Sequence, residues 1–406
     1  MQRLAIALLA VAAVVPAAAP NALAQDPFTL TATGGGQTVS VSANNVIDLA
    51  GDLVETRNEF SPLANRNVTA NLRYGGLENA VLVNRNAAGT SATITLPTTG
   101  FTRTFTAANE DALADEIEDF FRSEGAEEYA RFLRSVNEAT TLGVVDGNPL
   151  AATALMADAS FYRFGFQSPR FDLGEGPRMP SGLQFQASGG MADTDDGDGF
   201  YASAGLGNTF RFGDRVGLSL NLDYRYRDVE GAALHQLVST TGLPIMIVQP
   251  GSDGGLSWTV TPAFVIGFGG SWDLAAGGFP IGGQITSSLA LRAGGWTFVL
   301  ANQYGFYQGL GIGFGDWDFE TDVDQQILKN GVQVIRTFGA AGRGFVDAGV
   351  AYTNFLDEAA TDNYITPSAG VGVRFGTASG LRVGYHGNFA DNFTTHGGDV
   401  TLFFSF

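Results

Sequence analysis

Apolar and polar residues alternate with a period of two along the C-terminal half of the chain. Between Arg215 and Arg227, one side carries Val216, Leu218, Leu220, Leu222, Tyr224 and Tyr226, and the other carries Ser219, Asn221, Asp223 and Arg225. The same alternation recurs at 183–189, 200–212, 256–266, 281–292, 296–307, 346–354, 364–375, 381–389 and 400–406, and more weakly at 310–319 and 332–338. This pattern predicts about twelve strands.

Each predicted strand has one apolar and one polar face, and most are close to the roughly ten residues that a tilted strand needs to cross a bilayer. Closure of such strands into a barrel pairs every sheet edge and leaves the apolar face to lipid. We therefore expect an all-β fold in which residues 181–406 form a transmembrane antiparallel β-barrel.

The chain ends on a strand in which Val400, Leu402, Phe404 and Phe406 share one face. A terminal Phe with apolar residues at every second position upstream resembles the C-terminal assembly signal of Gram-negative outer-membrane β-barrels. The resemblance implies an outer-membrane location, with outer-membrane lipids and the barrel-assembly machinery as partners.

The first 24 residues are typical of a secretory signal peptide. Arg3 precedes an apolar run over residues 4–15, and Ala22 and Ala24 provide small residues for cleavage after position 24. The run is shorter than the roughly 20 residues of a spanning helix. We expect Sec-type export followed by removal of this peptide.

Between the two ends, short Thr- and Ser-rich strands separated by turns predict a small exported β region over residues 25–108. Asn109 followed by acidic residues predicts a helix start, and Gly125 divides a helical apolar pattern into two amphipathic helices within 109–160. Packing of these helices on the β region is favoured over a role as a plug in the barrel. Residues 161–180 are expected to be a linker.

Turn lengths give the predicted barrel a direction. The tight turns at 213–214, 340–344 and 376–380 should face the periplasm, and the longer connections at 192–199, 229–255, 321–330, 356–363 and 391–397 should face outward. Two connections disagree, because the count puts the tight 293–295 turn outside and the longer 269–280 connection inside. Trp258, Trp272, Trp296 and Trp317 lie near strand ends, as in an aromatic girdle.

Composition narrows the function. The formal charge of −19 argues against a nucleic-acid partner, and the absence of cysteine from 406 residues excludes disulfides and thiol chemistry. His235, His386 and His396 fall in no catalytic or metal-binding motif, so we expect no enzyme activity.

Charged residues in the polar phase of the strands are the candidate lumen-facing group: Arg211, Arg215, Asp223, Arg225, Arg227, Arg292, Asp347, Arg374, Arg382 and His386. A charge that faces lipid near mid-membrane costs about 2–4 kcal/mol, which explains their phase. They fit equally an anion-selective pore or a plugged lumen in which they pair internally.

The loop containing Asp193, Asp195, Asp196 and Asp198 has spacing that resembles a calcium site. A solvated acidic loop is favoured because Ca²⁺ needs six or more converging oxygen ligands. We expect no cofactor, with Ca²⁺ as the weaker alternative.

The leading functional hypothesis is a passive, porin-like channel for small solutes, or a scaffold, whose N-terminal region plugs or gates the lumen. The order of segments also resembles autotransporters, which export or display an N-terminal passenger. Against this alternative, the main predicted helix lies far upstream of the first barrel strand. A surface adhesin acting through its loops is the third hypothesis.

Overall fold

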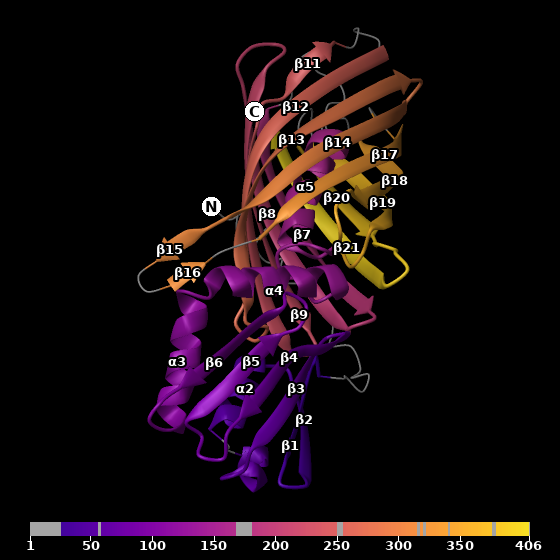
Figure 1. The fold of residues 1–406 in the computed structure, drawn as a ribbon. Helices are drawn as coiled ribbons and strands as arrows, with labels where there is room; N and C mark the ends of the chain where they lie inside the picture. Colours follow the sequence, from indigo (N-terminus) through magenta and orange to yellow (C-terminus); the bar gives the residue numbers. More distant parts are fainter. Residues whose placement is uncertain are drawn as a thin grey trace, which may run out of the picture.

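The computed structural model describes residues 26–55, 58–167, 181–249, 255–314, 317–319, 322–339, 342–375 and 379–405. They form an N-terminal sheet with helices and a C-terminal barrel (Figure 1). The predicted signal peptide, residues 168–180 of the predicted linker and Phe406 lie outside the described residues. Within the described ranges, no helix is long and apolar enough to cross a membrane.

The N-terminal part is built on an antiparallel six-stranded sheet in the order β2-β1-β3-β4-β5-β6. The strands are β1 (Phe28–Gly34), β2 (Gln37–Ala43), β3 (Val68–Tyr74), β4 (Leu77–Arg85), β5 (Ser91–Leu96) and β6 (Phe101–Thr106). Strict alternation gives the sheet two unlike faces. In β1, Phe28, Leu30 and Ala32 are buried, whereas the Thr residues between them are more exposed.

Helices cover the apolar face of this sheet. They are α2 (Val46–Val54), the short helix η2 (Asn58–Leu63), α3 (Glu110–Arg122) and α4 (Ala126–Ala139). Asn109 caps α3 as expected, because its side chain accepts a hydrogen bond of 2.9 Å from the Ala112 backbone N–H. In α3, the ring of Phe120 stacks on Phe101 at 5.8 Å and meets Phe105 edge-on. The two predicted amphipathic helices therefore pack on the β region.

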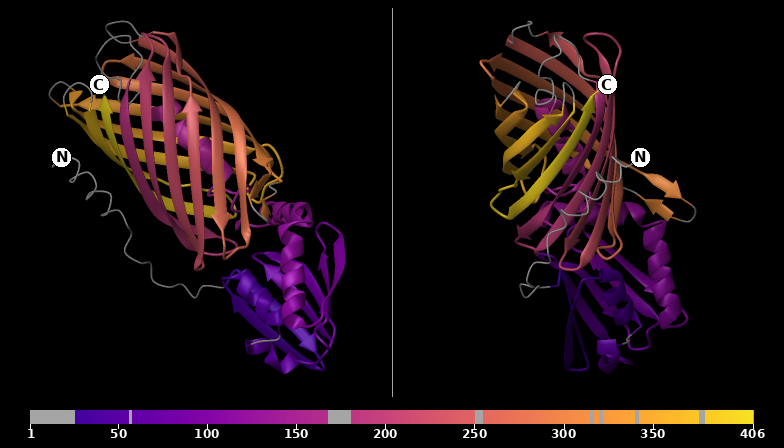
Figure 2. Two further views of the ribbon diagram at one scale, coloured as in Figure 1. Left: turned by 90° about the vertical axis from the view of Figure 1, so that its left-hand side faces the viewer. Right: turned by 180° about the vertical axis from the view of Figure 1, so that it is seen from behind.

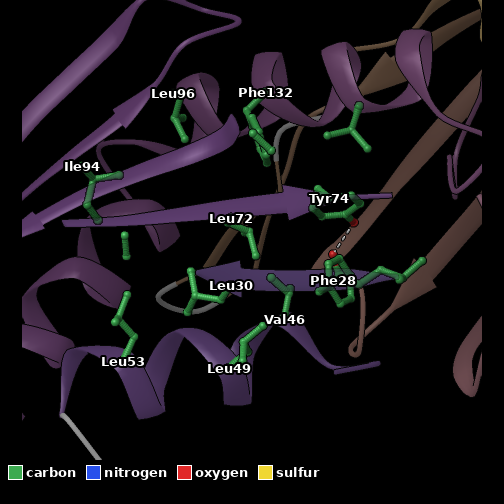
Figure 3. Close-up of a cluster of buried hydrophobic side chains, with 14 of the residues drawn as sticks. Phe28, Leu30, Val46, Leu49, Leu53, Leu72, Tyr74, Ile94, Leu96 and Phe132 are labelled. Atoms are coloured by element: carbon green, nitrogen blue, oxygen red, sulfur yellow. Dashed lines mark hydrogen bonds between the residues drawn. The ribbon is translucent and has the colours of Figure 1, made fainter. Parts of the chain in front are cut away.

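The core between sheet and helices is closed by large side chains. Phe28, Leu49, Leu53 and Tyr74 are each at most 3% exposed and meet in the space between α2 and the sheet (Figure 3). Burying such side chains stabilises the fold by roughly 1.5–3 kcal/mol each, which gives this part its own hydrophobic core.

Twelve antiparallel strands form the barrel: β7 (Gly182–Thr194), β8 (Gly199–Arg211), β9 (Gly217–Val229), β10 (Ala232–Gly242), β12 (Gly255–Ser271), β13 (Ala276–Ala293), β14 (Trp296–Leu310), β17 (Asp324–Phe338), β18 (Gly344–Phe355), β19 (Asn363–Phe375), β20 (Ser379–His386) and β21 (Phe393–Ser405). Each pairs with its neighbours, β21 pairs with β7, and β10 pairs with β12 to complete the ring (Figure 2). The predicted all-β fold with a C-terminal barrel is confirmed.

The two faces of the barrel wall are reversed relative to a water-soluble protein. Phe264 and Val371 on the outer face are 55% and 54% exposed, whereas the inward Gln236 and Gln333 are at most 1% exposed. Val400, Leu402 and Phe404 of the expected assembly signal lie in the outer phase of β21. An apolar exterior around a polar interior is the arrangement that lipid requires, so the architecture is that of an outer-membrane β-barrel.

The predicted strand total is right, but two assignments behind it are wrong. Residues 310–319 do not form a barrel strand; Ile312–Phe314 (β15) and Trp317–Phe319 (β16) form a separate two-stranded hairpin. Residues 229–255 are not a single outer loop, since they contain β10 and the short strand β11 (Ile245–Val248), which pairs with β12. β10 lacks the alternation of the other strands, because the apolar Leu234 and Val238 face inward and His235 faces outward.

These two errors explain the disagreement in turn direction. With β10 counted as a barrel strand, the Gly294-Gly295 turn lies at the same end of the barrel as the 213–214 turn. Because residues 310–319 are not a barrel strand, the turns after β14 keep the ends that the sequence predicted. The connection between β12 and β13 then lies at the opposite end, where the N-terminal part sits (Figure 1).

Candidate functional site: the plugged lumen

The chain between α4 and the first barrel strand enters the barrel and fills it. Residues 140–157 are all buried, first as an irregular segment and then as α5 (Ala152–Ser160). A π-helical stretch, η3 (Phe161–Gln167), continues α5. Both views in Figure 2 show this helix inside the ring of strands. We call residues 141–167 the plug.

Hydrogen bonds from the wall hold the plug along its whole length. Near the N-terminal part, Arg227 donates to the Thr141 carbonyl at 3.2 Å, and Gln236 donates to the carbonyls of Val144 and Leu150 at 3.1 and 2.7 Å. At the far end, Ser288 donates to the Gly165 carbonyl at 2.7 Å. Further contacts in the middle join Thr153 to Gln325 at 2.8 Å and Ser160 to Gln284. The irregular segment satisfies its backbone through the wall, as a non-helical stretch at membrane depth must.

Among the described residues, two ion pairs join the plug to the wall. Lys329, which is fully buried, donates to the Asp158 carboxylate of α5, and the Tyr364 hydroxyl lies 3.5 Å from the same oxygen. Arg163 of η3 lies 3.6 Å from Asp223 of β9 and also donates to Asn221. Removing one partner of such a buried pair costs about 3–5 kcal/mol because the other charge is left unpaired.

Small residues of the wall make room for the plug. A Cβ on Gly331 would lie 2.7 Å from the Phe166 ring and 3.0 Å from the Phe161 ring, and one on Gly267 would lie 2.9 Å from the Met156 sulfur. Since these distances are shorter than normal van der Waals contacts, larger residues at these positions would displace the plug. The plug and the wall are therefore fitted to one another.

A second charged cluster lies in the wall itself. Arg382 donates to Asp347 at 2.8 and 3.0 Å and to Asp399 at 2.5 Å. His386 lies 3.7 Å from Asp399, and its Nε2 is 2.9 Å from the Tyr201 hydroxyl. The cluster links β18, β20 and β21, so internal pairing accounts for these charges.

The candidate lumen-facing residues divide into three groups. Asp223, Arg225, Arg227, Asp347 and Arg382 are buried inside the barrel, and His386 is half-buried beside them. Arg292 and Arg374 are half-buried near the end that carries the C-terminus of β21, and Arg211 and Arg215 are exposed at that rim. The structure therefore brings only the first group to the plug or to the charged cluster.

A polar cavity of about 100 Å³ remains between the plug and the wall. The plug contributes Leu155, Asp158 and Tyr162, and the wall contributes residues of β7–β9 and β19–β21, among them Tyr201 and Arg225. The ion pairs with the plug and within the wall account for the inward Asp223, Asp347 and Arg382, so these charges do not require an open channel.

The N-terminal part is docked on the same end of the barrel at which the plug enters. The Asp273 carbonyl in the β12–β13 turn accepts a hydrogen bond from the Val46 backbone N–H at 2.9 Å, and the Leu274 carbonyl accepts one from the Tyr74 hydroxyl at 2.7 Å. Leu274 and Val323 are also buried in the core of the N-terminal part. Burial raises the pKa of the Tyr74 hydroxyl well above its usual range. We call this contact the docking junction.

The acidic loop takes part in this junction. The Asp196 carboxylate accepts hydrogen bonds from the backbone N–H groups of Gly76 and Thr141, both at 2.5 Å. Asp198 lies at the barrel rim, where burial raises its pKa and the neighbouring Asp193 adds to the shift. In the part of the chain that the structure describes, no three acidic or histidine side chains gather as metal ligands. Asp193 lies near the end of β7, and Asp195 lies in the loop that follows it.

A buried carboxyl group lies below the junction. Asp146 is 7% exposed and accepts a hydrogen bond from the Asn137 amide of α4. Burial raises the pKa of this carboxyl to about 7, although the Asn137 hydrogen bond and the Arg134 charge act in the opposite direction. The contact between α4 and the plug therefore contains a carboxyl group with a pKa of about 7.

Sequence reasoning missed the plug and its main anchors. Lys329 is the only lysine in the chain and lies in the polar phase of β17, which was a usable signal for a special interior role. Asp158 gave no such signal, because a single acidic residue in a short helix is ordinary. Tyr201, Gln284 and Gln303 are inward polar residues that alternation predicts only as a class.

Comparison with known proteins gives structural likeness only. No protein-family model and no curated protein matches the chain. The barrel resembles the β domain of the Bordetella autotransporter BrkA, with 15% identity and a TM-score of 0.42; the match covers 56% of this chain and all of that one. It also resembles the translocator domain of the autotransporter NalP from Neisseria meningitidis, with 14% identity and a TM-score of 0.45; this match covers 63% of this chain and 97% of that one. A third similar structure is the NanC porin, with 10% identity and a TM-score of 0.37; the match covers 55% of this chain and 100% of that one. Translocator domains and porins thus both occur among the similar barrels.

Proposed function

We propose that this outer-membrane barrel displays residues 26–139 as a folded domain on the cell surface and retains the plug in its lumen. The observation that carries the proposal is the path of the chain. The N-terminal domain docks at one end of the barrel, the plug runs through the lumen, and β7 begins at the other end.

The direction of this path follows from the barrel ends. Gly182, the first residue of β7, pairs with Ser405 near the end of the chain, and the Gly294-Gly295 turn lies at the same end. Outer-membrane barrels keep their short turns in the periplasm. The opposite end, which carries the domain and the longer β14–β17 connection, would then face the exterior.

The filled lumen favours display over passive passage. The plug is buried and bonded to the wall from Thr141 to Gly165, so a solute would have to displace it. The objection that the main helix lies far upstream of the barrel does not hold for α5 and η3, which lie inside the barrel and end at Gln167, shortly before β7. This order of segments supports the autotransporter-like alternative rather than the porin-like hypothesis.

The domain must then cross the membrane during assembly. Its six-stranded sheet and helices are wider than a lumen already filled by a single helix, so the segment would pass unfolded and fold outside. Burial of its apolar side chains, among them Phe28 and Tyr74, supplies the driving force for folding at the surface, and the same cluster continues into the barrel at Leu274 and Val323.

Thiol labelling in intact cells tests the orientation, since the chain offers a background without cysteine. Gln37→Cys places a thiol at the exposed start of β2, and Asp214→Cys places one in the exposed turn at the other end of the barrel. A maleimide that cannot cross the outer membrane should label Gln37→Cys in intact cells and Asp214→Cys only after permeabilisation.

The reverse labelling pattern would overturn the proposal and put the domain in the periplasm. Labelling of both sites in lysed cells provides the control for access to the thiols. Full-length protein recovered from washed cells, with the label still attached to the barrel, is expected if the domain is retained.

A further inference from the structure

The cavity between the plug and the wall is lined by charged groups, of which the carboxylates form ion pairs and one arginine does not. Asp158, Asp223 and Asp399 face it, and each lies within ion-pair distance of a cation: Lys329, Arg163 and Arg382 respectively. Arg382 also pairs with Asp347, so three cations serve the four carboxylates of the cavity and the adjoining charged cluster.

Arg225 also lines the cavity. Its charge acts on Asp223, which pairs with Arg163, and its guanidinium lies 5.9 Å from the Tyr201 ring centroid, but no described carboxylate is within ion-pair distance of it. Arg225 is 8% exposed, forms no ion pair with any described residue, and its Nε and Nη1 have no hydrogen-bond partner among the described residues. Arg227, two residues further along the same face of β9, is 1% exposed and likewise forms no ion pair within the described ranges. With Arg225 and Arg227 included, five basic side chains lie beside the four carboxylates, which leaves an excess of one positive charge.

A buried guanidinium group without a counter-ion is costly, because desolvation is not offset by an opposite charge. Hydroxyl groups line the cavity beside it, and Ser203 is the direct cross-strand neighbour of Arg225 between β8 and β9. The Ser188 and Ser203 hydroxyls are 2.6 Å apart, and the Ser368 hydroxyl has no partner among the described residues. Arginine and hydroxyl groups together form the donor set that suits an oxyanion.

We propose that this cavity binds a small oxyanion, of the size of inorganic phosphate or a short carboxylate, with Arg225 as its counter-ion. The volume of about 100 Å³ sets the size limit. It is below the roughly 150 Å³ of a cavity that holds one benzene molecule, so the ligand must be small, and a nucleotide is too large.

Binding here would stabilise the plugged state. Leu155, Asp158 and Tyr162 of the plug form one side of the cavity, and Arg225 lies on the other. An anion between them bridges plug and wall, and a ligand that binds only the plugged form shifts the equilibrium toward it. The inference does not depend on which way the barrel is oriented.

The test measures binding of inorganic phosphate to the purified full-length chain in detergent, by calorimetry at constant ionic strength with chloride as the balancing anion. Saturable binding of one phosphate per chain is expected, with acetate as a competitor. Arg225→Gln should weaken binding at least tenfold, and Arg225→Lys should retain part of it. Arg336→Gln, which changes an arginine stacked over Trp296 at the barrel rim, provides the matched control and should bind as the unchanged protein does.

Ser203→Leu keeps every charge but fills the cavity, so it should abolish binding even if Arg225→Gln fails to fold. Far-ultraviolet circular dichroism and heat-dependent gel mobility verify that each variant is folded. Absence of saturable phosphate binding, or equal binding in Ser203→Leu and the unchanged protein, would overturn the inference and leave a cavity that holds water only.

Discussion

Asp158→Ala removes the carboxylate that pairs with Lys329 and leaves that ammonium group buried in the lumen without a counter-ion. Loss of one partner of a buried pair costs about 3–5 kcal/mol. The Asp158 side chain is 14% exposed, so the lower part of this range applies. Since about 1.4 kcal/mol corresponds to a tenfold change in an equilibrium constant, opening of the plug should become roughly 10²–10³ times more frequent.

A thiol in the plug reports this opening. Ala154→Cys introduces a small change at a fully buried position of α5, and its reaction with a maleimide requires the plug to leave the wall. The labelling rate, compared between Asp158→Ala and the unchanged Asp158 in this background, gives the change in opening free energy.

A double substitution separates the ion pair from general damage. Combining Asp158→Leu with Lys329→Met removes both charges and should recover most of the lost stability, because a buried pair can be replaced by apolar side chains. Arg336→Ala, far from the plug, should leave the labelling rate unchanged. Equal labelling rates in Asp158→Ala and the unchanged protein would refute the idea that this pair holds the plug.

Three further outcomes are expected. The folded-state pKa of Asp146 is about 7, above the ordinary value near 4, so the stability that its protonated form contributes is complete below pH 4 and is lost as the pH rises through about 7. Release of the N-terminal domain, measured by limited proteolysis between pH 5 and 9, should therefore increase with pH. Asp146→Asn should remove this pH dependence. Gly331→Val should push Phe166 from the wall and raise thiol labelling of α5, whereas Gly283→Ala, whose Cβ meets nothing within 4 Å, should not; equal effects would contradict the fitted-wall argument. Deleting residues 26–165 should turn a barrel of low conductance in planar bilayers into a conducting one, and an unchanged conductance would show that the plug is not the barrier.

The sequence determined the class of the fold because alternation with a period of two is a local property. Leu222 and Asp223 are adjacent in the chain, yet the Leu222 side chain faces outward and the Asp223 side chain faces inward. The facing of each side chain can therefore be predicted within a single strand. Local chemistry also placed the Asn109 cap and the helix pair. It failed for β10, where apolar residues and Thr occupy both faces, and for residues 310–319, whose aromatic alternation belongs to a separate hairpin.

What only the tertiary structure decided is where the non-barrel segments lie. The pairing of Asp158 with Lys329, the entry of the plug and the docking of Tyr74 on the β12–β13 turn join residues far apart in the chain. No local pattern encodes such contacts, because the lumen exists only once the ring of strands is closed. Which segment is buried in the lumen then depends on its fit to wall residues from several strands. The physical reason is that burial inside the barrel is a property of the closed ring, and not of any one strand.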